Sequence, residues 1–330
     1  MIKKILQGLI KVVLLGIGIG LFLFWIRKLG VDALAQTLQE LKADWWKILL
    51  VSLLWNFFYA MAWRSYFVNL NRHIPFWSLF KIKICGEAMN LMTPLNFVVG
   101  DPVRFAMVQK RISGYCPSGS ILTDRLLNSL ATVFFVWMGI VIAFFSPYYV
   151  PRHILWIVFG LYSLINIFFI TILYLIYKHQ AVGQIHKIMH WIPFKKVRSF
   201  MENAVDEMVV EFDFLKDKAL TFFAPAFLCH LAGRFLGAVE ILIILKGLQF
   251  EGTILLGIIL ASLTAACNLI FAFLPGALGV METFYSLFFK WQGLSDVFGI
   301  PIQLIRRIRA FFWILVGLIL LMIPARKRAS

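Results

Sequence analysis

Residues 126–151 read LLNSLATVFFVWMGIVIAFFSPYYVP and contain no charged side chain. A helix needs about 20 mostly apolar residues to cross the hydrocarbon core of a bilayer, so this stretch is long enough to span it. Comparable uncharged runs occupy residues 153–177 and 252–281. The repetition of such runs predicts an all-α protein that crosses a membrane several times.

The composition of the 330-residue chain leads to the same prediction. Hydrophobic residues make up 61% of the chain and charged residues 15%, and the mean hydropathy is +0.86. A soluble globular domain carries about 25% charged residues, so a soluble protein is excluded.

The net charge of +16 does not indicate a nucleic-acid partner, because Lys and Arg are scattered between the apolar segments and form no basic domain. The four cysteines, at positions 85, 116, 229 and 267, contain no closely spaced pair. Such spacing favours neither a disulfide nor a metal site. We therefore expect no metal, no cofactor and no nucleic acid.

The apolar segments predict about six full spans and two interrupted, re-entrant helical hairpins within a single membrane domain, 1–330. The interrupted segments contain Pro, Gly and acidic residues where a simple span has none, and they cover about 80–110 and 253–290. The predicted full spans are 5–26, 46–67, 125–146, 154–177, 219–245 and 303–323.

The distribution of basic residues predicts the orientation. If both interrupted segments return to the side from which they start, one face holds 21 of the 32 Lys and Arg residues and the other holds 10. The positive-inside rule makes the richer face cytoplasmic. The expected location is the bacterial inner membrane, with both termini in the cytoplasm. A cleaved signal peptide is the alternative for residues 5–26, but Arg27, Lys28 and Asp32 favour an uncleaved anchor helix.

The same layout predicts an internal repeat. Residues 46–146, repeat A, read span, interrupted hairpin and span, and residues 219–323, repeat B, read the same in the opposite orientation. Residues 178–218 between them form a polar segment with apolar positions at helical spacing, which predicts a cytoplasmic amphipathic helix. Inverted repeats with broken helices are common in transporters. An accidental match between helix breaks is the alternative; the predicted breaks are at Pro94, Gly100, Pro275, Gly276 and Gly279.

Charged residues inside the first interrupted segment are the strongest functional signal, because an ionisable side chain at membrane depth needs a partner, a water-filled cavity or a function. Glu87, Asn90 and Pro94 lie on one face of a helix that must break near the proline. After Asn96 the chain reaches Asp101, Pro102 and Arg104, which predicts a new helix beginning at the proline, with the aspartate as its cap. We expect a polar substrate cavity here; the alternative is that Asp101 only caps the helix and pairs with Arg104.

Arginines also lie at the ends of later spans. Arg125 and Asn128 share a helix face at the expected start of one span, and Arg306 and Arg309 lie at the start of the last. The planar guanidinium suits phosphate oxygens, so these arginines are expected to flank an anionic headgroup. The alternative for Arg125 is that its side chain extends to the interface.

The second half carries further candidates. Arg234 lies within a predicted span. Glu240, six residues further on, is turned away from Arg234, so the partner of Glu240 is expected on another helix. Gly233 and Gly237 predict close helix packing. Glu282 follows the second break, with Asn268 before that break. A headgroup or proton role and a buried pair with an arginine of the last span both remain open for Glu282.

These motifs resemble those of the flippase-like membrane family typified by the transmembrane region of lysylphosphatidylglycerol synthases, over residues 5–323. The last motif, PGxxGxxE followed by an arginine near 306, is the most specific. The residues before Gly100, NFVV at 96–99, depart from the Gly-rich pattern of the family. The resemblance is carried by NLMTP (90–94), GDPVR (100–104), DRL (124–126) and LPGALGVME (274–282).

The resemblance implies translocation of an anionic lipid, either a phospholipid or a polyprenyl-phosphate-linked lipid, between leaflets. The soluble aminoacyl-transferase domain of the two-part synthases does not follow before Ser330, so lipid aminoacylation is not expected. Two alternatives remain: a non-catalytic protein that presents lipid to a synthase or glycosyltransferase, and a membrane-embedded lipid-modifying enzyme. The expected protein partners are a second copy of the chain, in a homo-oligomer, or a lipid-modifying enzyme. The chain lacks a DxD or DxxD motif, which disfavours the enzyme.

Overall fold

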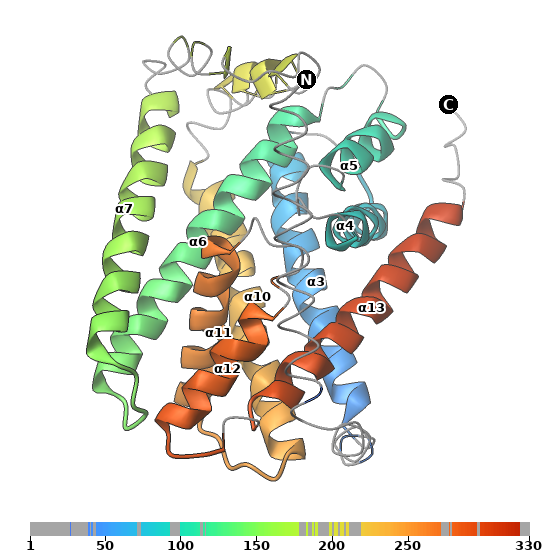
Figure 1. Cartoon of the computed structure of the whole chain (residues 1–330). Coiled ribbons are helices and arrows are strands. Elements are labelled where there is room, and N and C mark those ends of the chain that lie inside the picture. The colour runs from blue at the N-terminus through green and yellow to red at the C-terminus, as the bar shows by residue number, and fades with distance from the viewer. Residues whose placement is uncertain are drawn as a thin grey trace, which may run out of the picture.

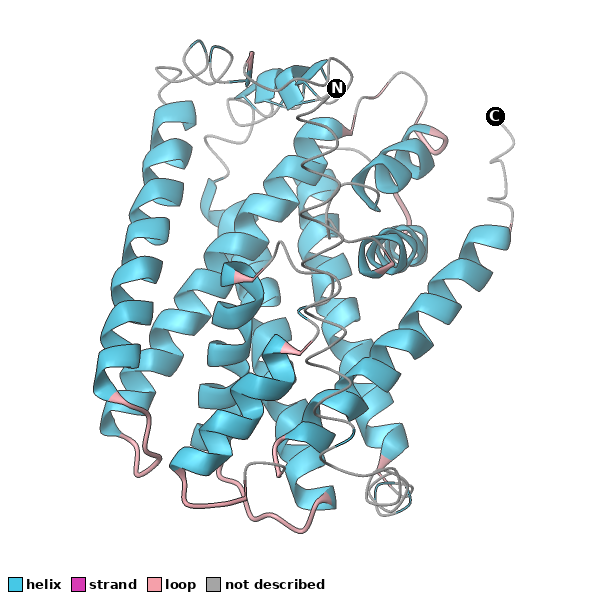
Figure 2. Cartoon of the chain, viewed as in Figure 1, coloured by secondary structure: helices cyan, strands magenta, loops and turns pink. Residues whose placement is uncertain are grey.

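A computed structural model of the chain shows a bundle of helices (Figures 1 and 2). Within the part of the chain that it describes, there is no strand. The prediction of an all-α membrane fold is confirmed at this level. The described residues are 44–70, 74–92, 100–112, 117–177, 219–271, 279–295 and 298–323, together with isolated positions outside these ranges.

The first half begins with a long helix, continues with two short ones and ends with two long ones. The short pair lies beside the upper part of the bundle in Figure 1, and α7 forms its opposite edge. The bounds are α3 Trp45–Asn69, α4 Phe76–Leu91, α5 Gly100–Gln109, α6 Ser118–Phe145 and α7 Arg152–Tyr177.

The second half has the same order of a long helix, two short helices and a long helix. The last helix crosses the face of the bundle diagonally in Figure 1 and ends near α4. The bounds are α10 Ala219–Gly247, α11 Ile254–Ile270, α12 Val280–Trp291 and α13 Ile300–Met322.

Most predicted spans agree with these helices to within a few residues, but two local predictions are wrong. The helix α6 begins at Ser118 rather than near 125, so Arg125 lies inside a helix and not at its start. The helix α5 begins at Gly100, so Asp101 lies in its first turn and is not its cap. Both errors arise because polar residues were taken to mark the ends of helices.

Three of the described helices are long and apolar enough to cross a membrane: Trp45–Asn69, Ser118–Phe145 and Phe223–Gly247. Two shorter apolar helices accompany them, Arg152–Phe168 and Ile254–Ile270. The helix α13 is of comparable length but carries three arginines in its first half.

Four helix pairings bring the two halves of the chain together: α3 packs against α10, α4 against α13, and α6 against both α10 and α11. Close packing at Gly233 is confirmed, because a Cβ atom there would lie 2.2 Å from the ring of Tyr59 on α3. Close packing at Gly237 was predicted wrongly, since no atom of a neighbouring element lies within 4 Å of a Cβ atom placed there. Exchange of repeats A and B maps the pairings α3–α10, α4–α13 and α6–α11 onto one another, but it does not map α6–α10 onto another of the four. The opposed orientation of the repeats stays a prediction.

Apolar side chains fill the bundle and also cover its outside. The main core includes Phe135, Tyr162 and Ile259, all nearly inaccessible. On the outer faces Trp156 of α7 and Phe311 of α13 are 60% and 67% exposed. Large apolar side chains on the outside are expected where lipid rather than water surrounds a helix.

Several predictions fall outside the described residues. They are the anchor helix 5–26, most of the segment 178–218, Pro94, Asn96, Pro275 and Gly276. Gly279 is described: it precedes α12 directly and has a φ of 75°, in the left-handed region that favours glycine.

Candidate functional site

A polar cavity of about 130 Å³ lies between α3, α4, α5, α6 and α10. Such a volume holds several water molecules. Its wall contains four basic side chains but only two acidic ones. The lining residues are Trp55, Asn56, Tyr59, Lys83, Glu87, Arg104, Asp124, Arg125, Asn128 and Arg234. We call this space the headgroup cavity.

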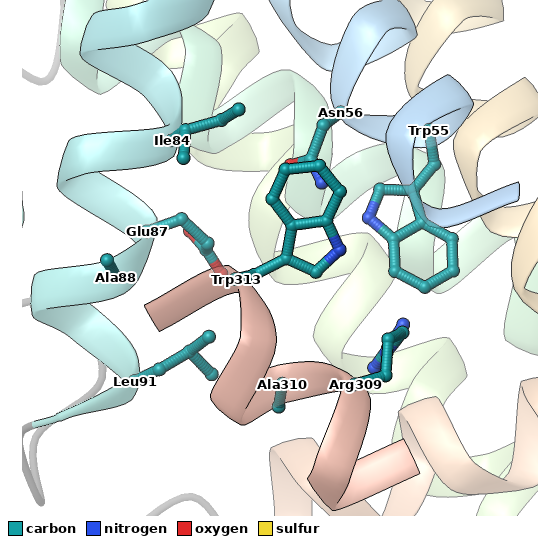
Figure 3. A pocket seen from close by; sticks show the side chains of 9 residues that line it. All are labelled: Trp55, Asn56, Ile84, Glu87, Ala88, Leu91, Arg309, Ala310 and Trp313. Atoms are coloured by element: carbon teal, nitrogen blue, oxygen red, sulfur yellow. The ribbon is translucent and has the colours of Figure 1, made fainter. Parts of the chain in front are cut away.

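A second cavity, of about 120 Å³, adjoins the first and shares Trp55, Asn56 and Glu87 with it. The remaining lining is mostly apolar and comes from α4 and α13. Figure 3 shows Glu87 extending from α4 into this space, with Trp55 and Asn56 opposite on α3. The other lining residues are Ile84, Ala88, Leu91, Arg309, Ala310 and Trp313. We call this space the α13 cavity.

A chain of ion pairs connects α4, α5 and α6 at one wall of the headgroup cavity. Asp101 bonds Arg125 of α6 at 2.8 Å and Arg104 of α5 at 3.3 Å. Arg104 also reaches Glu87 of α4 at 3.3 Å. Since the side chain of Arg104 is only 2% exposed, these carboxylates provide the compensation that its buried charge requires.

The start of α5 is held by α4. The backbone N–H of Gly100 donates to the side-chain oxygen Oδ1 of Asn90 at 2.9 Å. A side chain of α4 thus satisfies the first backbone donor of α5. Beside it, Gly86 lets Arg104 approach: a Cβ atom on Gly86 would lie 2.4 Å from Nε of Arg104. The start of α5 is therefore held by the side chain of Asn90, and Gly86 leaves room for Arg104.

Lys83, Asp124 and His230 form a second buried charge group, from α4, α6 and α10. Asp124 Oδ2 accepts a hydrogen bond from the ammonium of Lys83, and its Oδ1 lies 3.3 Å from Nε2 of His230. The sequence analysis missed Lys83 and His230 as site residues. A lysine within the apolar face of the interrupted segment was the available signal.

Arg234 differs from the other cations of the headgroup cavity. Its Nη2 donates to Oδ1 of Asn128 at 3.0 Å, and its guanidinium lies 6.0 Å from the ring centroid of Tyr59. No carboxylate of the described residues forms an ion pair with it. It therefore presents to the cavity a positive charge that no described acid neutralises.

A separate network lies between α10, α12 and α13. Glu240, fully buried, pairs with Arg306 at 3.3 Å and Arg309 at 3.1 Å. The expectation that its partner lies on another helix is confirmed. Arg306 also donates to the hydroxyl of Tyr285 at 3.0 Å, which lies 2.9 Å from Thr264 Oγ1.

Glu282 is the acid of the PGxxGxxE motif and is fully buried. Its carboxylate accepts the N–H of Gly279 at 2.9 Å and pairs with Arg307 at 2.8 Å. The structure thus places Glu282 in a buried pair with an arginine of the last helix, one of the two roles left open by the sequence.

The structure therefore divides the predicted site residues. Glu87, Arg104, Arg125, Asn128 and Arg234 line the headgroup cavity, and Arg309 lines the α13 cavity. Asp101 and Asn90 hold this wall together through the bonds given above. The side chains of Glu240, Glu282 and Arg306 line neither cavity, and Asn268 is exposed near the end of α11. Sequence reasoning did not find Trp55, Asn56 and Tyr59, because aromatic and amide residues are unremarkable in an apolar helix.

The described residues contain no group of three or more His, Cys, Asp or Glu side chains that is suited to hold a metal ion. The chemistry of the cavity is that of guanidinium, ammonium and carboxylate groups with aromatic rings beside them.

One family model matches almost the entire chain. Its description is lysylphosphatidylglycerol synthase TM region, and it covers residues 9–318. The chain belongs to this family. The resemblance carried by the sequence motifs is therefore confirmed, and family membership indicates a lipid-related role in a membrane. A search of curated proteins and a search of solved structures each gave no significant match.

The family match covers both cavities and the buried ion pairs described above, since their residues all lie between 9 and 318. The basic headgroup cavity and the apolar α13 cavity thus lie within the part of the chain that defines the family.

Proposed function

We propose that the chain binds the anionic headgroup of a lipid in the headgroup cavity and carries it between the two leaflets of the bilayer. The observation that carries the proposal is Arg234: it lines a cavity with an excess of basic side chains, and no described acid pairs with it. A guanidinium binds phosphate oxygens through paired, charge-assisted hydrogen bonds.

The division of the cavities into polar and apolar parts supports a lipid rather than a free anion. Glu87, Trp55 and Asn56 line both cavities, so the two spaces adjoin. An anionic headgroup suits the arginine-lined part, and the first carbons of its chains suit the part formed by Ile84, Leu91 and Trp313 (Figure 3). A soluble anion has no apolar chains that would occupy the apolar part.

The position of the helix ends of α4 and α5 supports movement of the headgroup. α4 ends at Leu91 and α5 begins at Gly100, and Asn90 holds the start of α5 next to the cavity wall. Helix ends of this kind are found at the substrate sites of transporters.

The test is transfer of a labelled anionic phospholipid between leaflets in proteoliposomes. The native chain is expected to speed transfer, and Arg234→Gln is expected to slow it at least tenfold, because about 1.4 kcal/mol of lost binding is a factor of ten. The matched control is Arg152→Gln, at the exposed first residue of α7, and it should behave as the native chain. Equal transfer rates for Arg234→Gln and the native chain would show that Arg234 does not bind the headgroup.

A native chain that binds anionic lipid but moves none would support the alternative of a lipid-presenting partner. Covalent modification of the labelled lipid by the purified chain would instead support an enzyme. Both outcomes contradict the transport proposal, and binding and product analysis separate them.

A further inference from the structure

The binding step described above assigns no role to His230, which forms a buried group with Lys83 and Asp124 of the cavity wall. The exposed fractions of these side chains are 8%, 5% and 1%, so all three are removed from solvent. Isolated buried charges are costly, and a group of three side chains that can change its charge by one proton is unusual inside a bundle of apolar helices.

Asp124 stands between the headgroup cavity and the imidazole. With Lys83 it lines that cavity, and with His230 it borders a smaller space that has no room for a water molecule. The other ring nitrogen of His230, Nδ1, has no hydrogen-bond partner among the described residues. A positive imidazole at this position therefore depends on Asp124 for compensation.

The charged and titratable groups around His230 come from every helix packed near it. The ring of Tyr59 lies tilted against the imidazole at a centroid distance of 5.4 Å, and Arg234 is on α10 itself, one turn further along. The groups are Tyr59 and Tyr66 from α3, Lys83 and Glu87 from α4, Arg104 from α5, Asp124 and Arg125 from α6, and Arg234 from α10. Basic groups outnumber acidic ones in this set, which disfavours a further positive charge on His230 while the cavity holds no anion.

We propose that His230 binds a proton together with the anionic headgroup, so that the chain takes up lipid and proton as one coupled step. The inference rests on the proposed function for the presence of the anion. An anion in the cavity competes with Asp124 for the ammonium of Lys83, and the charge of Asp124 is then available to an imidazolium. The proton comes from water in the cavity, passes the carboxylate that borders both spaces and joins the neutral imidazole.

Coupling of this kind is reciprocal: if the anion favours the proton, the proton favours the anion to the same degree. Binding of an anionic lipid should therefore remove protons from solution, and the affinity for that lipid should rise as the pH falls. For one coupled proton, the affinity changes by up to about tenfold per pH unit.

The experiment uses the full chain in detergent with a weak buffer and a pH-sensitive dye. Short-chain phosphatidylglycerol is added, and phosphatidylcholine with the same chains is the control lipid. The native chain is expected to take up a fraction of a proton, at most about one, per bound phosphatidylglycerol and none with phosphatidylcholine. Absence of uptake on phosphatidylglycerol binding would overturn the proposal without any variant.

The variant pair is His230→Gln and His153→Gln, a buried and an exposed histidine. His230→Gln should lose both the proton uptake and the pH dependence of binding, whereas His153→Gln should keep both. Uptake that persists in a folded His230→Gln chain, checked by its thermal melting, would overturn the assignment. Proton uptake without lipid transfer in vesicles would contradict transport but not coupling; transfer without uptake would contradict coupling alone.

Discussion

The guanidinium of Arg309 lies over the indole ring of Trp55, 4.4 Å from its centroid. Trp55 lines both cavities and Arg309 lines the α13 cavity, so this pair forms part of the boundary between them. Arg309 also pairs with Glu240 of α10 at 3.1 Å. The guanidinium at this boundary is thus held by an aromatic ring and an acid from two other helices.

Removal of the ring should weaken lipid binding. Trp55→Ala leaves Arg309 held by Glu240 alone and joins the two cavities, and a desolvated cation–π contact is worth about 2 kcal/mol. We expect about a tenfold loss of anionic lipid binding in a titration, whereas Trp55→Phe, which keeps a ring, loses less. The control is Trp46→Ala at an exposed position of the same helix. A Trp55→Ala chain with native affinity would exclude the ring from the site.

Glu240 should be essential for stability rather than only for binding. Glu240→Gln leaves Arg306 and Arg309 buried without their carboxylate, and breaking a buried ion pair costs about 3–5 kcal/mol of unfolding free energy. We expect a clear fall in the thermal melting temperature in detergent. Glu251→Gln, at an exposed position before α11, should change the unfolding free energy by less than about 0.5 kcal/mol. Equal melting of the two variants would contradict the network.

Glycine at position 86 should be required for the position of Arg104. In Gly86→Ala the new Cβ meets the side chain of Arg104 at 2.4 Å and forces it away from Glu87 and Asp101. Overpacking of this kind costs about 1–3 kcal/mol. Gly160→Ala in α7 is the matched control: nothing lies within 4 Å of its Cβ, and alanine there should stabilise the helix by about 0.5–1 kcal/mol. Chemical denaturation should give opposite signs for the two changes.

The hydroxyl of Tyr285 should contribute measurably to the packing of α12 on α13. Tyr285→Phe removes the bond to Arg306 and the contact with Thr264, and a buried hydrogen bond to a charged group is worth about 1.5–3 kcal/mol. The melting temperature should fall. Tyr149→Phe, where the ring is 61% exposed, should leave it unchanged. If both variants melt alike, the hydroxyl of Tyr285 has no net effect.

Much of the fold was predictable from residue type and order. The apolar segments led to α3, α7, α10 and α13 within a few residues, because apolar length determines where a helix can lie in lipid. The starts of α5 and α6 were wrong, since Asp101 and Asp124 were treated as boundary residues. Inside this bundle each of them has basic partners, so the helix continues through the charge.

The site was predictable in part. Charges within apolar segments correctly indicated that partners exist, but the pairs themselves join residues far apart in the chain, such as Arg306 with Glu240. Periodicity describes one helix at a time and says nothing about which faces meet. The functional role of these residues stays a prediction until the variants are tested.

The sequence by itself determined that the chain is a helical membrane protein of this family and that its charges are costly enough to need partners, because burial in lipid penalises every uncompensated charge. The tertiary structure alone decided which charges cancel. Packing of α10 against α3 and α6 places Arg234 beside Asn128 and Tyr59 rather than beside a described carboxylate. Packing of α13 against α10 and α12 instead pairs Arg306 and Arg309 with Glu240, and Arg307 with Glu282. Which basic residue remains open to an anion is therefore a property of helix contacts.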